Sequence, residues 1–312
     1  MIHLKKIILP VSLAINLILI GLITKYLMQQ MVSVPNQIQK YPFLSKRIFA
    51  EHQNDLLINL IPLRTALREY VEKINRPIGI YFEYLPTGVS IGINEKDSFV
   101  MASLLKVPVV MAVYRQIELG NLTFDQQLTV APEMIDEEFG KFWKKGPGTK
   151  ISVSEAIRLT LTKSDNTAKN VLFYNLPAGA IEDVFDNLDI PKETQEKLAS
   201  VNPKNYTSML RSLYLSAYLT KDHSNEILQL LSRTDFYDKL PAGVPQTIPV
   251  SHKIGVYAPD DPDRSLYSDC GIVYLPQRPY ALCLMIRSDE DTARQVMKTV
   301  SKMIYKYISA LN

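Results

Sequence analysis

Apolar residues recur every three or four positions in several stretches of the chain, and this spacing predicts amphipathic helices. The first helix is expected over residues 54–75, where Pro62 either kinks the helix or marks its true first turn. Further helices are expected over residues 103–119 and 152–163. A last helix opens at Ser288, where acidic residues follow at once and suit a helix N-terminus. Other segments, between and beside these helices, have extended, strand-like patterns instead.

Extended patterns occur near both ends of the folded part of the chain. Residues 78–84 and 89–93 read as two strands joined by a Leu-Pro-Thr-Gly turn. Residues 248–257, 268–274 and 280–287 read as three consecutive strands, with a helical block between the two sets. This order predicts an α+β fold in which both ends of the chain build one antiparallel sheet flanked by helices. The intervening block is expected to form an all-helical lobe.

The N-terminus carries a pattern typical of a membrane segment. Lys5 and Lys6 precede 18 uncharged residues, 7–24, and Lys25 follows them. Eighteen apolar residues are just enough to span a bilayer, and no small-x-small cleavage site follows, so an uncleaved anchor is favoured over a signal peptide. We expect a cytoplasmic tip and transmembrane anchor over residues 1–28, a connector over 29–53 and a folded domain over 54–312. The domain is then extracytoplasmic on a single-pass membrane protein, or secreted if the anchor is cleaved.

Composition and cysteine content narrow the possible functions. A net charge of +3 in 312 residues gives no reason to expect a nucleic-acid partner. The two cysteines, Cys270 and Cys283, are too few for a disulfide scaffold or a zinc site. They flank a predicted hairpin turn at residues 275–279, and a tight register would place them opposite each other. An external location permits a disulfide there, but two buried thiols are the favoured expectation because cysteine packs well in cores.

Three short polar motifs carry the candidate chemistry. They are Ser103-Leu104-Leu105-Lys106, Ser164-Asp165-Asn166 and Lys253-Ile254-Gly255. A serine three positions before a lysine on one helix face places a hydroxyl beside an amine that can take its proton. Alone, each motif has a plainer explanation: a helix cap with a surface lysine, a turn, and a basic residue on an edge strand. The three together, in this order, are hard to explain by chance.

The motifs resemble the S-x-x-K, S-D-N and K-T-G set of class A β-lactamases and penicillin-binding proteins. The resemblance covers roughly residues 54–312 and implies the β-lactamase-type fold. It assigns the nucleophile to Ser103, the general base to Lys106 and the proton relay to Ser164, with Asp165 structural. No metal or organic cofactor is implied.

The resemblance also implies a substrate-binding set. Asn166 and Lys253 would hold the substrate, with Lys253 contacting its carboxylate, and Gly255 would let the substrate lie against the strand. The backbone N–H groups of Ser103 and Val256 would form the oxyanion hole, a kind of donor pair worth about 10²–10³ in rate.

Two departures from the family pattern limit the expected activity. Ile254 stands where the family has Thr or Ser, which removes a hydroxyl that would contact the substrate carboxylate. No E-x-x-L-N motif follows, although its glutamate activates the deacylating water in class A β-lactamases. The segment over residues 189–197 stands in its place, shortened. Glu193 or Glu196 could substitute for the missing glutamate, but the favoured expectation is that both lie on a solvated helix surface.

The sequence therefore predicts a β-lactamase-like serine hydrolase that forms an acyl-enzyme on Ser103. The expected partner is a β-lactam or a D-Ala-D-Ala-type cell-wall peptide, and deacylation is expected to be slow. The alternative is a non-catalytic or single-turnover sensor that binds β-lactams or peptidoglycan. The missing glutamate and Ile254 favour this alternative, whereas the intact set of Ser103, Lys106, Ser164 and Asn166 disfavours it.

Overall fold

The computed structural model describes residues 19–22, 24–25, 42–43, 59–195, 197–259 and 264–311. The chain divides into two compact units, residues 1–53 and 54–312. Most of the predicted anchor and connector lies outside the described residues. Within the described part of the chain, no helix combines the length and the apolar character needed to cross a membrane.

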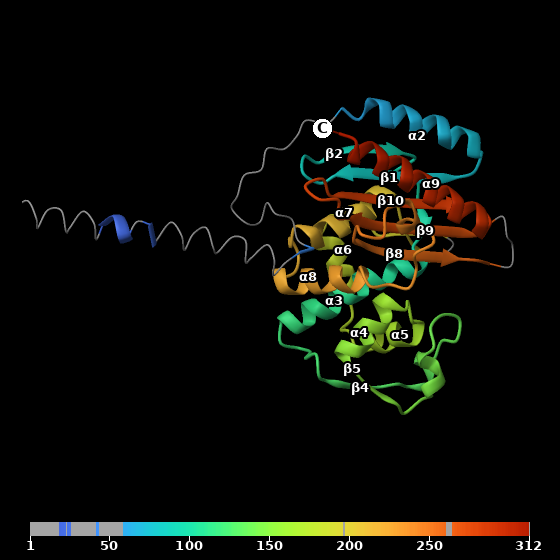
Figure 1. The fold of residues 1–312 in the computed structure, drawn as a ribbon. Coiled ribbons are helices and arrows are strands. Elements are labelled where there is room, and N and C mark those ends of the chain that lie inside the picture. The colour runs from blue at the N-terminus through green and yellow to red at the C-terminus, as the bar shows by residue number, and fades with distance from the viewer. Residues whose placement is uncertain are drawn as a thin grey trace, which may run out of the picture. The chain divides into compact units, whose positions relative to one another are not determined.

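The larger unit is built on a five-stranded antiparallel sheet (Figure 1), with strand order β2-β1-β10-β9-β8. The strands come from both ends of the unit, as the extended patterns predict. Their bounds are Ile78–Tyr84 for β1, Val89–Ile93 for β2, Val250–Tyr257 for β8, Leu266–Val273 for β9 and Tyr280–Arg287 for β10. Every residue of β1 and β9 is buried, and the buried carboxylates of Glu83 and Asp269 on these strands are paired with Arg211 and His252.

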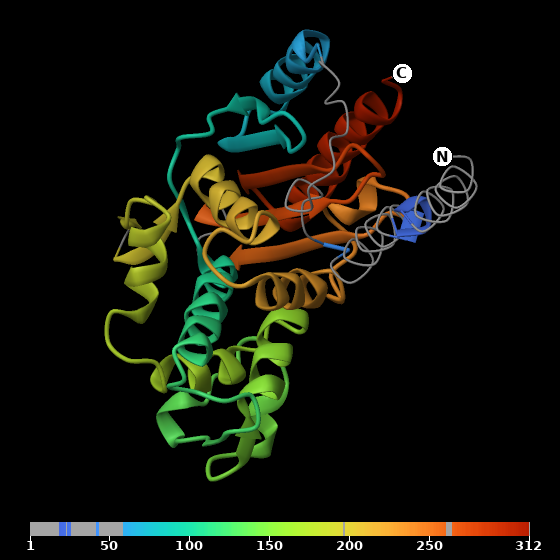
Figure 2. The ribbon, with the colours of Figure 1, turned by 90° about the vertical axis from the view of Figure 1, so that its left-hand side faces the viewer.

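Two helices cover one face of this sheet. Helix α2 (Ile61–Ile74) and helix α9 (Glu290–Ser309) lie together on this face, in blue and red in Figure 2. Pro62 stands in the first turn of α2, which settles the two alternatives for this proline. Asp289 caps α9 by accepting a hydrogen bond from the N–H of Thr292 at 2.8 Å. The apolar stripes of both helices pack on the sheet to form the main core.

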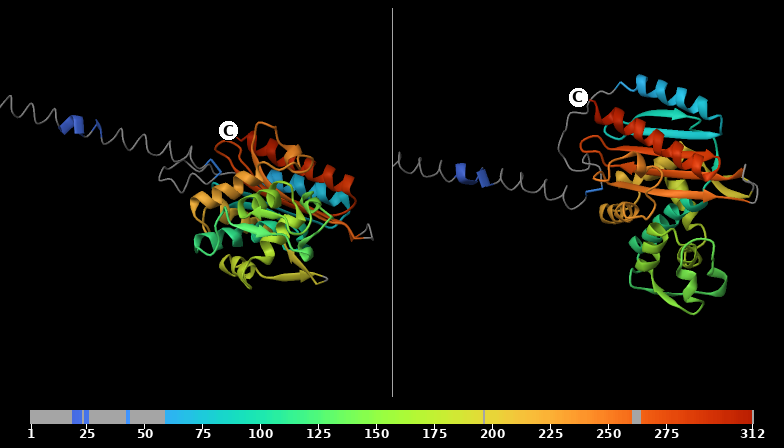
Figure 3. Two further views of the ribbon diagram at one scale, coloured as in Figure 1. Left: turned by 90° about the horizontal axis from the view of Figure 1, so that it is seen from below. Right: turned by 45° about the vertical axis from the view of Figure 1, so that its right-hand side comes forward.

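The other helices gather on the opposite side of the sheet and beyond it, as Figure 3 shows. Helix α7 (Pro203–Tyr214) packs on β1, β9 and β10, and the block also contains two small sheets. The lobe is therefore not all-helical as predicted, because short strands of two to four residues give too little alternation to be recognised. The elements of this block are β3 (Phe99–Val100), η2 (Ala102–Leu105), α3 (Lys106–Glu118), β4 (Gln127–Thr129), η3 (Pro132–Met134), η4 (Phe142–Lys145), β5 (Lys150–Ser152), α4 (Val153–Thr162), α5 (Asn166–Tyr174), α6 (Ala180–Asn187), β6 (Glu193–Gln195), β7 (Leu198–Val201), α7 (Pro203–Tyr214), α8 (Lys221–Leu231) and η5 (Pro241–Gly243).

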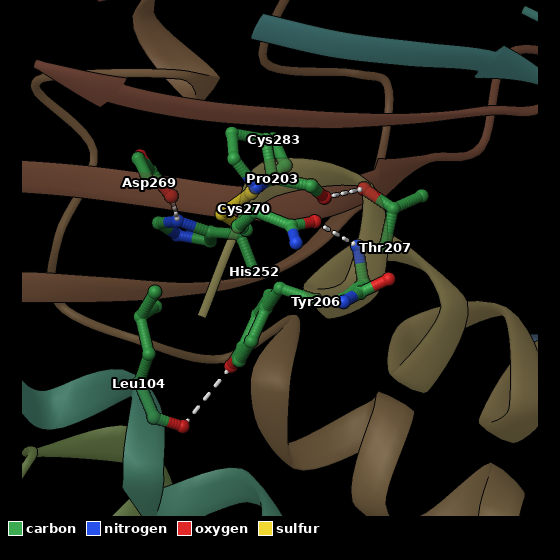
Figure 4. Close-up of a disulfide and its surroundings, with 10 residues drawn as sticks. Leu104, Pro203, Tyr206, Thr207, His252, Asp269, Cys270 and Cys283 are labelled. Atoms are coloured by element: carbon green, nitrogen blue, oxygen red, sulfur yellow. Dashed lines mark hydrogen bonds and ion pairs between the residues drawn. A yellow bond between two sulfur atoms is a disulfide. The ribbon is translucent and has the colours of Figure 1, made fainter. Parts of the chain in front are cut away.

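The two cysteines form a disulfide across β9 and β10 (Figure 4). The hairpin register pairs Cys270 directly with Cys283, as the turn predicted. The favoured expectation of two free thiols is wrong. Both side chains point to the same face of the sheet in this register, so the sulfur atoms meet beneath α7 rather than packing separately.

Candidate active site

The nucleophile motif sits in a tight turn at the start of a buried helix. Ser103 lies in the 3₁₀ turn η2, and Lys106 is the first residue of α3. Side chains at i and i+3 eclipse in a 3₁₀ turn, and Lys106 Nζ accordingly lies 2.7 Å from Ser103 Oγ. Ala102 enters the turn with φ of 44°, a left-handed conformation that costs free energy for a residue with a Cβ and is concentrated at functional sites.

The second motif brings its side chains to the same amine. Lys106 Nζ donates to the carbonyl oxygen of Ser164 at 2.8 Å and lies 3.1 Å from its hydroxyl. It also donates to Asn166 Oδ1 at 2.6 Å. Asn166 in turn donates from Nδ2 to Asp136 Oδ1 at 2.9 Å, which fixes the orientation of its amide. Segments some 60 residues apart thus converge on Lys106.

Ser164 is held between two lysines. Its hydroxyl lies 2.8 Å from Lys253 Nζ as well as 3.1 Å from Lys106 Nζ. The residue is completely buried and adopts φ of 53°. A serine in a left-handed, fully buried position, placed between two amines, is suited to pass a proton from one side of the site to the other.

Asp165 has a structural role, as predicted. Its Oδ1 accepts from the N–H of Ala168 and so caps α5. Its Oδ2 accepts from the N–H groups of Lys141 and Phe142, both at 2.8 Å. Gly140 has φ of 95°, and a Cβ there would lie 2.1 Å from Asp165 Oδ2. The aspartate therefore ties the preceding loop to α5 and needs a glycine in that loop.

The third motif lies on β8, the edge strand of the sheet beside η2. Lys253 is only 1% exposed, and Gly255 faces the turn that carries the nucleophile. A Cβ on Gly255 would lie 3.1 Å from both Leu104 Cγ and Met101 O, so the glycine lets β8 approach this turn closely. Val256 follows on the edge strand and is 36% exposed. The predicted contacts of Gly255 and Val256 with substrate remain predictions.

Burial and mutual repulsion change the charge state of the two lysines. Burial lowers the pKa of Lys106 to about 7, assisted by the positive charge of Lys169. Burial also holds the pKa of Lys253 well below its usual range, and the charge of Lys106 adds to this effect. A lysine with a pKa near 7 is partly neutral at physiological pH and can accept a proton from a hydroxyl.

Two aromatic rings from outside the three motifs stand over these lysines. The ring centroid of Phe139 lies 5.9 Å from Lys106 Nζ, and that of Phe236 lies 5.7 Å from Lys253 Nζ. The two rings contact each other, with centroids 5.9 Å apart. Together with Ile254 and Val256 they line an open depression of about 550 Å³. Loop aromatics have no periodicity, so no pattern in the sequence marks them.

The segment that replaces the E-x-x-L-N loop is a β-hairpin. Strands β6 and β7 pair with each other, and β7 also pairs with β3. The prediction that Glu193 lies on a solvated helix surface is therefore wrong, because Glu193 is half-buried on strand β6. Glu196 lies outside the described residues. Glu193 lines an apolar cavity of about 660 Å³ that reaches Met101 and Leu105, on either side of Ser103.

The nucleophile and its neighbouring amine have no direct carboxylate partner among the described residues. In that part of the chain there is also no group of three or more His, Cys, Asp or Glu side chains that could hold a metal ion. The site thus consists of hydroxyls, amines and one amide.

Comparison with known proteins identifies the family. A family model described as the beta-lactamase enzyme family matches residues 62–308. Beta-lactamase VEB-1 of Pseudomonas aeruginosa is 21% identical over 249 residues, covering 69% of this chain and 82% of that protein. The extended-spectrum beta-lactamase PER-1, also of Pseudomonas aeruginosa, is 25% identical over 248 residues, covering 70% and 80%.

Solved structures show the same fold. The structure of PBP-A is similar with a TM-score of 0.73 at 23% identity, covering 81% of this chain and 97% of that chain. A class A beta-lactamase from Mycobacterium abscessus is similar with a TM-score of 0.70 at 20% identity, covering 79% and 99%. Since the family model matches well over half of the chain, the protein belongs to the beta-lactamase enzyme family and is a β-lactamase-like serine hydrolase that acts on amide bonds.

Proposed function

We propose that the protein opens its substrate's amide bond by forming an acyl-enzyme on Ser103. Lys106, as a neutral amine, takes the proton of the Ser103 hydroxyl while Oγ bonds to the carbonyl carbon. The amide C–N bond then breaks, and the leaving nitrogen receives a proton through Ser164. The observation that carries this proposal is the 2.7 Å separation of Lys106 Nζ from Ser103 Oγ, with Ser164 within reach of both lysines.

The proposed substrates are β-lactams and D-Ala-D-Ala-type peptides of the cell wall. Asn166 and Lys253 are proposed to hold the substrate, Lys253 through its carboxylate, and the N–H groups of Ser103 and Val256 to bind the developing oxyanion. Several relatives are named beta-lactamases. Lys253, whose amine is buried beside Ser164, supplies the hydrogen-bond donor for the substrate carboxylate.

Deacylation of a β-lactam is proposed to be slow. A water needs a positioned base to attack the acyl-enzyme, and in the described part of the chain no carboxylate bonds to Lys106 or Ser103. One structural neighbour gives this proposal a parallel: a single-residue mutant of PBP-A was solved as an acyl-enzyme complex with penicillin G, with a TM-score of 0.73 to this chain. This behaviour is that of a penicillin-binding peptidase rather than of an efficient β-lactamase.

The proposed site of action is outside the cytoplasm. Uncharged residues 7–24 between flanking lysines support a single-pass anchor, with the folded unit on the outer side of the cell membrane, where a cell-wall peptide is accessible. Cleavage of the anchor would release the same unit as a secreted protein.

Intact-protein mass spectrometry with penicillin G tests the proposal. The full chain is mixed with penicillin, and the mass of the protein and the concentration of free penicillin are followed over time. A lasting adduct that Ser103→Ala abolishes is the expected result. Loss of penicillin without an adduct would instead mean efficient β-lactamase turnover, and a persistent adduct on the Ser103→Ala variant would exclude Ser103 as the nucleophile.

A cell-wall peptide distinguishes an enzyme from a sensor. Repeated release of D-alanine from a D-Ala-D-Ala peptide, in excess over the protein, is the expected result. Acylation by penicillin combined with no turnover of peptide, ester or thioester substrates would support the alternative of a single-turnover sensor.

A further inference from the structure

A third lysine, Lys169, lies on α5, the helix that begins at Asn166 of the second motif. Asn166, Lys169, Asn170 and Phe173 recur at helical spacing on α5, so they share one face of this helix. Asn166 at the start of this face bonds to Lys106. Lys169 therefore lies one turn along α5 from a residue that contacts the proposed base.

The ammonium group of Lys169 is held in a defined place. Its Nζ donates to Asn170 Oδ1 at 2.5 Å, and Asn170 donates from Nδ2 to the carbonyl oxygen of Met134 at 3.0 Å. The Lys169 Nζ also lies 5.9 Å from the ring centroid of Phe173. The side chain is half-buried rather than extended into solvent, so its charge is only partly screened.

The charges that face Lys106 come from four places in the fold. Lys253 on β8 and Lys169 on α5 are the cations. Asp136, in the loop between η3 and η4, and Asp165, at the cap of α5, are the anions. Asp165 is occupied by three backbone N–H groups and Asp136 by Asn166 and the N–H of Glu138. Lys169 is thus a positive charge that opposes these two carboxylates at Lys106.

We propose that Lys169 is a positioning residue for the nucleophile pair, whose ammonium group disfavours a second positive charge on Lys106 and so leaves Lys106 free to accept the proton of Ser103. This inference rests on the proposed acylation of Ser103. The role agrees with the direction in which Lys169 acts on Lys106: its charge lowers the pKa of Lys106, second only to burial. Removal of the charge makes Lys106 easier to protonate, so acylation needs a higher pH.

The rate of acylation by a fluorescent penicillin, measured on the full chain between about pH 5.5 and 9, tests the inference. In Lys169→Met, the pH at which the acylation rate reaches half of its plateau is expected to rise by at least about half a pH unit. This corresponds to roughly a threefold loss of rate below pH 7. The plateau at high pH is expected to stay as in the native chain. Lys169→Arg keeps the charge and is expected to keep the native profile. Lys298→Gln, which removes an exposed lysine on α9, serves as the control.

A second variant guards against an effect of Lys169→Met on folding. Asp136→Asn removes a negative charge that faces the same amine while keeping the shape of the side chain. The profile is expected to move in the opposite direction, to lower pH, because Asp136 raises the pKa of Lys106. A merely structural disturbance gives no reason for opposite shifts.

Three results would overturn the inference. The first is a Lys169→Met profile that superposes on the native profile. The second is an equal loss of rate at every pH, which indicates a structural role. The third is a shift in the same direction for Lys169→Met and Asp136→Asn. Failure of the native chain to react at all would instead overturn the proposed function, and the inference with it.

Discussion

Strand β8 places two neighbouring residues, His252 and Lys253, in two different polar clusters. One cluster is closed to solvent, and the other includes a partly exposed serine. Lys253 points to the helical lobe, where it meets Ser164 and, through it, Lys106. His252 points to the other face, because successive residues of a strand alternate. There its Nδ1 donates to Asp269 Oδ1 at 2.7 Å, and its Nε2 lies 2.8 Å from Thr234 Oγ1.

The cluster around His252 contains a hydroxyl, an imidazole and a carboxylate in the order of a catalytic triad. Thr234 and His252 are each 1% exposed and Asp269 is fully buried. The second oxygen of Asp269 accepts from the N–H of Leu240 at 3.0 Å, so the cluster joins the loop after α8 to the sheet. The cluster has the residue types of an active site without access for a substrate.

The cluster around Lys106 differs because its nucleophile, Ser103, is accessible to a substrate. Ser103 is partly exposed, and the amine that contacts it has a pKa of about 7. A chemically useful arrangement therefore needs an accessible nucleophile and a base that can change its charge. The two clusters make different predictions, because one should control acylation and the other stability.

The largest effect is expected when Lys106 is replaced by Met, which keeps the length of the side chain and removes the amine. Without a general base the acylation rate at about pH 8 should fall by about 10²–10⁴-fold. In the native chain the rate should rise as pH increases through about 7, since only neutral Lys106 can take the proton. The rate of labelling by a fluorescent penicillin measures both. A variant that retains a tenth or more of the native rate would remove Lys106 from the mechanism.

The next effect concerns the closed cluster and is expected in the free energy of unfolding. Asp269→Ala leaves two buried donors, His252 Nδ1 and Leu240 N, without their acceptor. Each buried unpaired donor costs about 1–3 kcal/mol, so the variant should lose about 2–6 kcal/mol of stability in urea unfolding. Its folded fraction should still be acylated, with a far smaller loss of rate than Lys106→Met. Loss of labelling with unchanged stability would contradict the division between the two clusters.

Much of this arrangement can be predicted from the sequence, because it depends on local patterns. The strands of the main sheet follow from extended runs, and the pairing of Cys270 with Cys283 follows from the turn between them. The three motifs identify residues that meet around Lys106. Each of these features depends on a pattern that spans only a few consecutive residues.

The features that the sequence does not reveal depend on contacts between distant segments. Phe139 and Phe236 are far apart in the chain and meet only after the loops have folded. Lys169 reads as an ordinary surface lysine until α5 is placed beside Lys106. The hairpin over residues 193–201 resembles a surface helix in sequence because its strands are three and four residues long. The disulfide depends on oxidation, which a register alone does not specify.

The smallest effect is expected from Thr234→Val, which keeps the shape of the side chain and removes only its hydroxyl. His252 Nε2 then loses its partner, at a cost of about 1–2 kcal/mol in urea unfolding, while labelling by penicillin should be unchanged. The same substitution in the Asp269→Ala background should cost less, since the histidine is no longer held in place for the hydroxyl. Equal costs in the two backgrounds would mean that Thr234, His252 and Asp269 act independently. A slower acylation in Thr234→Val would mean that the closed cluster reaches across β8 to Lys253, and the contrast between the two faces of the strand would no longer hold.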